Sequence, residues 1–63
     1  MVDKFAAEIC RKLRSEMNDL ADHLASNNVQ TLDDYRYVCG VIRGLARAEE
    51  YTKDLAKAVE EAE

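Results

Sequence analysis

Apolar residues recur at steps of three and four along most of the chain, a spacing that predicts two amphipathic helices. The line in the first half consists of Ala6, Ile9, Leu13, Met17, Leu20 and Leu24, and Phe5 and Cys10 widen it. The line in the second half consists of Leu32, Tyr35, Val38, Cys39, Ile42, Leu45, Ala48, Leu55 and Val59, with Thr52 at one further position. We therefore expect helices over about 3–26 and 32–62.

The residues around these two segments match the preferences of helix ends. Asp3 is a candidate N-cap for the first helix, and Ser26-Asn27-Asn28 is a candidate stop, because Asn tolerates the left-handed conformation that closes helices. Thr31 is the candidate N-cap of the second helix, and Asp33 and Asp34 suit the positive end of its dipole.

A short connection between two long helices folds them back on each other, so the fold class is all-α, an antiparallel two-helix hairpin that forms one domain over residues 1–63. A turn centred between the predicted helices sets apolar residues against apolar residues. The predicted facing pairs are Leu24 with Tyr35, Leu20 with Val38, Met17 with Val41, Leu13 with Leu45 and Ile9 with Ala48.

Sixty-three residues, 48% of them hydrophobic, are too few to build a large core. The second helix also carries more apolar residues than one partner helix can cover. Positions 35, 38, 42 and 45 form one line, and positions 37, 41 and 48 drift onto another. We therefore expect oligomerisation or docking on a partner to complete the hairpin.

The expected partner or oligomer interface lies on the second helix. Its predicted residues are Tyr35, Val38, Cys39, Gly40, Ile42, Gly44 and Ala48. Gly40, Gly44 and Ala48, at steps of four, form a groove of small residues that favours close helix–helix contact, within the hairpin or between subunits. The alternative interpretation is that the helix merely tolerates two glycines.

Arg36, Arg43 and Arg47 form a basic line with Tyr51 nearby, which is a candidate polar contact face for phosphate, nucleic acid or an acidic partner. The alternative is a solvated face whose arginines pair with nearby acids. The net charge of −4 argues against nucleic acid as the partner.

Catalytic chemistry has no visible basis in the sequence, so we expect no enzyme activity, no cofactor, no metal site and no small-molecule substrate. Cys10, Cys39 and His23 stand alone, without the close spacing that zinc or redox motifs need. A long uncharged stretch and a signal-peptide pattern are both missing, so we expect neither a membrane span nor secretion, but free thiols in a reducing compartment.

Residues 32–48 resemble a segment of small, uncharacterised proteins of tailed bacteriophages, in which a Tyr-x-x-x-x-Gly-x-Ile-x-Gly-Leu pattern precedes an acidic helical tail. The matching residues are Tyr35, Gly40, Ile42, Gly44 and Leu45. Because such genes tend to stand among virion-morphogenesis genes, the resemblance implies a capsid-associated or head–tail role, with larger viral subunits as partners, in the virion or the host cytoplasm. It implies no catalytic residues.

The leading functional hypothesis is a small structural or assembly protein that acts by helix-mediated protein–protein contact as a virion component. A nonviral adaptor or regulator that dimerises into a four-helix bundle is the second hypothesis. A nucleic-acid binder that uses Arg36, Arg43 and Arg47 is the third.

Overall fold

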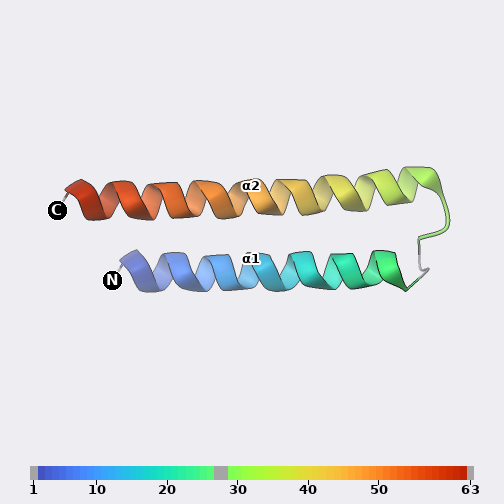
Figure 1. Cartoon of the computed structure of the whole chain (residues 1–63), viewed down its shortest axis with the longest axis horizontal. Helices are drawn as coiled ribbons and strands as arrows, with labels where there is room; N and C mark the ends of the chain where they lie inside the picture. Colours follow the sequence, from blue (N-terminus) through green and yellow to red (C-terminus); the bar gives the residue numbers. More distant parts are fainter. Residues whose placement is uncertain (1, 27–28, 63) are drawn as a thin grey trace.

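The protein, described by a computed structural model, is a hairpin of two antiparallel helices (Figure 1). Helix α1 runs from Val2 to Ala25, and helix α2 runs from Leu32 to Ala62. The structure describes residues 2–26 and 29–62, with side chains from Lys4 onward. The predicted fold class is confirmed, and the helix ends lie within a residue of the predicted ones.

Helix α2 begins with the cap that the sequence predicts. The Asp34 amide donates a hydrogen bond to the Thr31 hydroxyl oxygen at 3.0 Å. The Tyr35 amide donates to the Thr31 carbonyl oxygen at 3.1 Å and so starts the helical ladder. The Thr31 side chain therefore satisfies one of the first-turn amides that have no partner within the helix.

Helix α1 differs slightly from the prediction at its start and ends as expected. It begins at Val2, so Asp3 lies inside the first turn and not before it. The Asp3 side chain and the Asn27-Asn28 stop lie outside the described residues. At the other end, the Ser26 amide donates to the Asp22 carbonyl oxygen at 3.0 Å, which closes the last turn.

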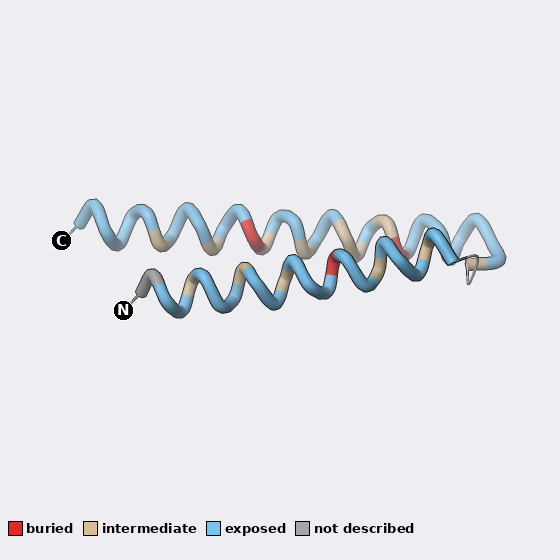
Figure 2. Tube along the Cα trace, turned by 60° about the horizontal axis from the view of Figure 1, so that its bottom comes forward, coloured by how far each residue is buried: buried red, intermediate tan, exposed pale blue. Residues whose placement is uncertain are grey.

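The hairpin is one layer of helices, and its principal extents are 49 × 16 × 10 Å. A single layer leaves the outer side of each helix in water, so little of either helix can be fully covered. Among the described residues, Met17 and Val38 are the only buried apolar side chains, with exposed fractions of 6% and 8%. Figure 2 shows that the buried and half-buried positions lie along the side on which the two helices face each other.

The facing line of α1 agrees with the prediction except at one level. Its buried and half-buried residues are Ala6, Cys10, Leu13, Met17, Leu20 and Leu24. Cys10 takes the place predicted for Ile9, which is 46% exposed and lies at the edge of the interface. Phe5 is exposed as well.

The facing line of α2 is shorter than predicted. It consists of Val38, Ile42, Leu45, Glu49, Thr52 and Ala56, flanked by the half-buried Cys39, Val41 and Ala48. Leu32 and Tyr35 at its start and Leu55 and Val59 near its end are exposed, although the apolar pattern placed all four against α1.

The predicted facing register was wrong by about one helical turn. Arg14 contacts Glu49 across the hairpin, and Cys10 lines a surface hollow together with Lys53. These pairs place Leu13 level with Glu49, and not with Leu45 as predicted. The start of α2 consequently extends beyond the end of α1 (Figure 1), which leaves Leu32 and Tyr35 without a facing helix.

Candidate interaction surface

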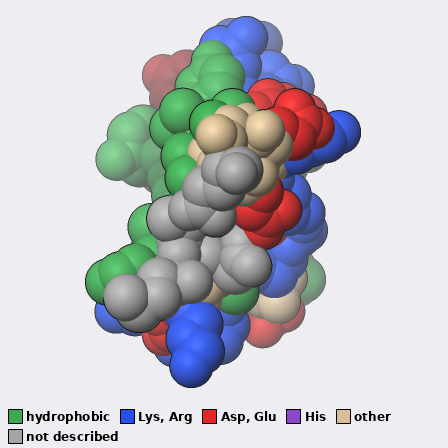
Figure 3. Space-filling view, turned by 90° about the vertical axis from the view of Figure 1, so that its left-hand side faces the viewer, with side chains coloured by type: hydrophobic (Ala, Val, Ile, Leu, Met, Phe, Trp, Pro, Cys, Tyr) green, Lys and Arg blue, Asp and Glu red, His purple; other side chains and the backbone are tan. Residues whose placement is uncertain are grey.

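Large apolar side chains from both helices gather on one long edge of the hairpin. Phe5 and Ile9 of α1 line a shallow hollow with Leu55 and Val59 of α2. The exposed fractions of Phe5 and Leu55 are 73% and 67%. In the end-on view of Figure 3, hydrophobic side chains gather along one side, while charged ones occupy the other side and the top and bottom of the view. An exposed apolar group of this kind is typical of a protein contact site.

The same edge continues along α2 toward the connection. There it consists of Tyr37, Val41, Gly44, Ala48 and Tyr51, of which Val41 and Ala48 are half-buried and the others exposed. We call Phe5, Ile9 and the α2 residues Tyr37, Val41, Gly44, Ala48, Tyr51, Leu55 and Val59 the apolar edge. No charged residue belongs to it.

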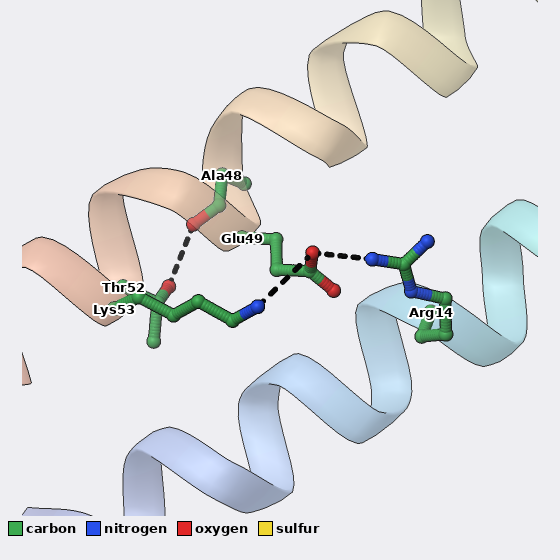
Figure 4. Close-up of polar contacts among 5 residues, drawn as sticks. All are labelled: Arg14, Ala48, Glu49, Thr52 and Lys53. Atoms are coloured by element: carbon green, nitrogen blue, oxygen red, sulfur yellow. Dashed lines mark hydrogen bonds and ion pairs between the residues drawn. The ribbon is translucent and has the colours of Figure 1, made fainter.

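The opposite edge carries a charged cluster centred on Glu49. The Glu49 carboxylate accepts a hydrogen bond from the Arg14 guanidinium at 2.5 Å and lies 3.6 Å from the Lys53 ammonium (Figure 4). Glu49 is 8% exposed, so two cations compensate the one carboxylate that the hairpin covers. The spacing of Glu49 and Lys53, four residues apart on one helix, is typical of such a pair. Arg14, by contrast, can be recognised as a partner only once the register of the two helices is known.

Thr52 is the polar residue that the pattern placed within the facing line of α2. Its hydroxyl donates a hydrogen bond to the Ala48 carbonyl oxygen at 2.7 Å (Figure 4). This bond satisfies the hydroxyl within its own helix, so Thr52 presents mainly its methyl group to the interface.

A second ion pair lies wholly on α1. The Arg11 guanidinium donates to both carboxylate oxygens of Glu8, at 2.6 and 3.0 Å. These hydrogen bonds hold the pKa of Glu8 below its ordinary value and raise the pKa of Arg11. Both side chains are mostly exposed, so the pair spans one helical turn without joining the two helices.

The glycine groove does not contact α1. A methyl group added at Gly40 or at Gly44 would meet no other atom within 4 Å. Close contact within the hairpin, one of the two forms that the sequence suggested, is therefore wrong, because α1 lies against a different side of α2. The space beside both glycines is open to a partner.

The other predicted interface residues divide between the two sides of α2. Val38 is buried and Ile42 half-buried in the hairpin's own interior, so their contacts are with α1. Cys39 and Ala48 are half-buried beside that interior. Tyr35 is exposed at the uncovered start of the helix.

The arginine line lies on the outer side of α2. Arg43 and Arg47 share a shallow groove with Gly40, Gly44 and Glu50, whereas Arg36 and Tyr51 are exposed outside it. The solvated-face interpretation expects these arginines to pair with nearby acids, but no ion pair among the described side chains joins them to Asp33 or Glu50. The structure thus gathers two of the three arginines in one groove.

The residues considered for chemistry are dispersed. His23 is exposed, and Cys10 and Cys39 are half-buried free thiols at different levels of the hairpin. In the part of the chain that the structure describes, no three His, Cys, Asp or Glu side chains come together as a metal site would require. Neither described helix has an apolar stretch long enough to cross a bilayer.

Comparisons with protein-family models, with curated protein sequences and with solved structures find no match. The class of protein that the structure defines is therefore that of its fold, an all-α helical hairpin with one apolar edge.

Proposed function

We propose that this chain works by helix-mediated contact with protein, as a small structural or assembly component. The observation that carries the proposal is the apolar edge. Large hydrophobic side chains from both helices are exposed to water there, whereas few apolar residues are buried between the helices. A surface of this kind gains free energy when another protein covers it.

The biological setting of this proposal is the assembly of a phage particle, in a capsid-associated or head–tail position. It is supported by the resemblance of residues 32–48 to small proteins of tailed bacteriophages. The residues that carry the resemblance include Gly44, which lies on the apolar edge, and Gly40 beside it. No catalytic step forms part of the proposal.

Mass spectrometry of purified virions and of assembly intermediates tests this setting. A Leu55→Ser/Val59→Ser variant removes apolar surface from the edge, and Lys57→Ser on the same helix is the matched control. We expect the parent and the control in particles or intermediates, and the double variant to be depleted from them. Absence of the parent from both, or equal recovery of all three, would contradict the proposal.

A nonviral adaptor or regulator that forms a four-helix bundle uses the same edge, so the same mutations weaken it. Its distinguishing result is a cellular protein partner lost with the Leu55→Ser/Val59→Ser variant. The groove of Arg43 and Arg47 gives less support to nucleic-acid binding, because Glu50 shares the groove and the whole chain is acidic. Absence of salt-dependent DNA binding would remove that third hypothesis.

A further inference from the structure

Beside the line of residues that faces α1, helix α2 carries a second line of residues with the spacing of a coiled-coil seam. Each facing residue from Val38 to Ala56 is preceded by a residue of this second line, so the two lines are about 100° apart around the helix. The second line, which we call the α2 seam, is Tyr37, Val41, Gly44, Ala48, Tyr51, Leu55, Ala58 and Ala62. Its steps alternate between four and three without interruption, as in the seam of a coiled coil.

We infer that the α2 seam binds a second copy of this chain, with the two α2 helices antiparallel and Gly44 of each copy opposite Leu55 of the other. This inference deepens the proposed function by naming a first partner for the apolar edge. Its occupant and its register both follow from the residues of the seam.

The sizes of the seam residues select this register. With Gly44 opposite Leu55, the next layers place Ala48 opposite Tyr51, Val41 opposite Ala58 and Tyr37 opposite Ala62. Each large side chain of one copy then meets a small residue of the other, which lets the backbones approach and the layers interdigitate. The open space beside Gly44 is where the Leu55 side chain of the second copy fits.

The charges beside the seam agree with the same register. In antiparallel coiled coils, residues on the same outer flank of the two helices face each other. Arg47 and Asp54 lie on the outer flank of the α2 seam, the side away from α1. In the inferred register, Arg47 of one copy comes beside Asp54 of the other, and the symmetry of the dimer makes this contact occur twice. Moving the register by one heptad in either direction brings Arg47 beside Arg47, or Asp54 beside Asp54, so like charges disfavour both alternatives.

The geometry of the hairpin allows this dimer. The seam lies on the α2 side that carries the apolar edge, where Leu55 shares a hollow with Phe5 and Ile9. A second α2 seated on the seam therefore covers part of α1 as well. The Arg14–Glu49 cluster stays on the opposite edge, clear of the contact.

Disulfide trapping tests the register directly. In a Cys10→Ser/Cys39→Ser background, the Gly44→Cys/Leu55→Cys variant should oxidise to a covalent dimer, because the new thiols of one chain are too far apart to join each other. The Tyr37→Cys/Leu55→Cys variant is the matched control, because its thiols would meet only if the register were shifted by one heptad. The single variant Gly44→Cys would form a covalent dimer only if the two α2 helices were parallel. A covalent dimer from either control with none from Gly44→Cys/Leu55→Cys would overturn the inference.

Sedimentation equilibrium across the micromolar range tests the occupant. Arg47→Asp should raise the dimer dissociation constant about tenfold at low salt, and adding Asp54→Arg should restore it. Arg43→Asp, with the same charge change outside the flank of the seam, should leave it unaltered. A parent that stays at the monomer mass of 7.1 kDa throughout overturns the inference.

The two proposals fail in different ways. A monomeric parent that is nevertheless recovered in virions contradicts the dimer and leaves the assembly role in place. A dimer with the trapped register that is missing from particles and intermediates contradicts the assembly role and leaves the dimer in place.

Discussion

Two arginines on α1 make comparable contacts in different settings. Arg11 binds Glu8 one turn away on the same helix, where both side chains are well solvated. Arg14 binds Glu49 on the other helix, where the Glu49 side chain is only 11% exposed. An exposed pair contributes little because water competes for both partners, whereas a covered carboxylate that loses a partner keeps the penalty of burial.

Replacing Arg14 should therefore destabilise the hairpin, while replacing Arg11 should not. We expect Arg14→Met to lower the free energy of unfolding by about 1 kcal/mol, since Lys53 still compensates part of the Glu49 charge. Arg11→Met is the matched control, and urea unfolding measures both. Equal stability of the two variants would show that the Arg14–Glu49 bond does not hold the helices together.

Replacing either glycine of α2 by alanine should change the stability of the hairpin in a direction that can be tested. Because no atom of the chain lies near an added methyl group, Gly40→Ala should stabilise the isolated hairpin by up to about 1 kcal/mol. Gly44→Ala should do the same in dilute solution, where the seam is free. Thermal melts at low protein concentration measure both, and a lower melting temperature for either would mean that another helix already occupies that side.

At the scale of whole elements, the sequence predicts both helices, their bounds and the capping residue Thr31, because these depend on local spacing and on the ends of each segment. Neighbouring apolar residues are harder to assign. Ile9 and Cys10 are adjacent and both apolar, and an apolar stripe about 100° wide admits either one. Only the position of α2 shows that Cys10 faces inward and Ile9 lies on the apolar edge.

The register was missed for a related reason. Apolar residues repeat along both helices, so a shift by one turn still sets apolar against apolar at most levels. The feature that distinguishes the observed register is the Arg14–Glu49 bond, which a pattern of apolar residues does not contain. Among the residues predicted for a partner interface, some, such as Val38, serve the hairpin's own interior.

The difference between Met17 and Ile9 provides a test at this scale. Met17 is buried at the middle of α1, so Met17→Ala should cost roughly 2–4 kcal/mol of unfolding free energy. Ile9→Ala, at a position 46% exposed, should cost clearly less in dilute solution. Thermal unfolding followed by circular dichroism compares them, and Met17→Leu keeps the comparison measurable if Met17→Ala does not fold. A larger loss for Ile9→Ala would place Ile9 in the interior.

For the molecule as a whole, thinness is the dominant property. A layer only 10 Å thick leaves most apolar residues partly in water, so folding and association contribute to the same stability.

The positions of the two thiols give a prediction at this scale. Cys10 lies level with Lys53, and about 21 Å of helix separates Lys53 from Cys39. A disulfide needs Cα atoms within about 7 Å of each other, so mild oxidation of the folded chain should form no bond between its two cysteines. Mass spectrometry of the oxidised protein checks this, and an internally bonded monomer would contradict the hairpin.

The extension of α2 beyond α1 also bears on the role of residues 26–31. A tight turn would have fixed the helices one turn away from where they lie, so contacts between side chains, and not the length of the connection, determine how the helices align. Lengthening the connection should then cost only the entropy of closing a slightly larger loop. Two glycines inserted between Val29 and Gln30 should lower the unfolding free energy by about 0.3 kcal/mol. Urea titration measures this loss, which should be much smaller than the loss caused by Met17→Ala. A loss this small would mean that the chain accepts an inserted peptide at this end of the hairpin without disturbing the alignment of its helices.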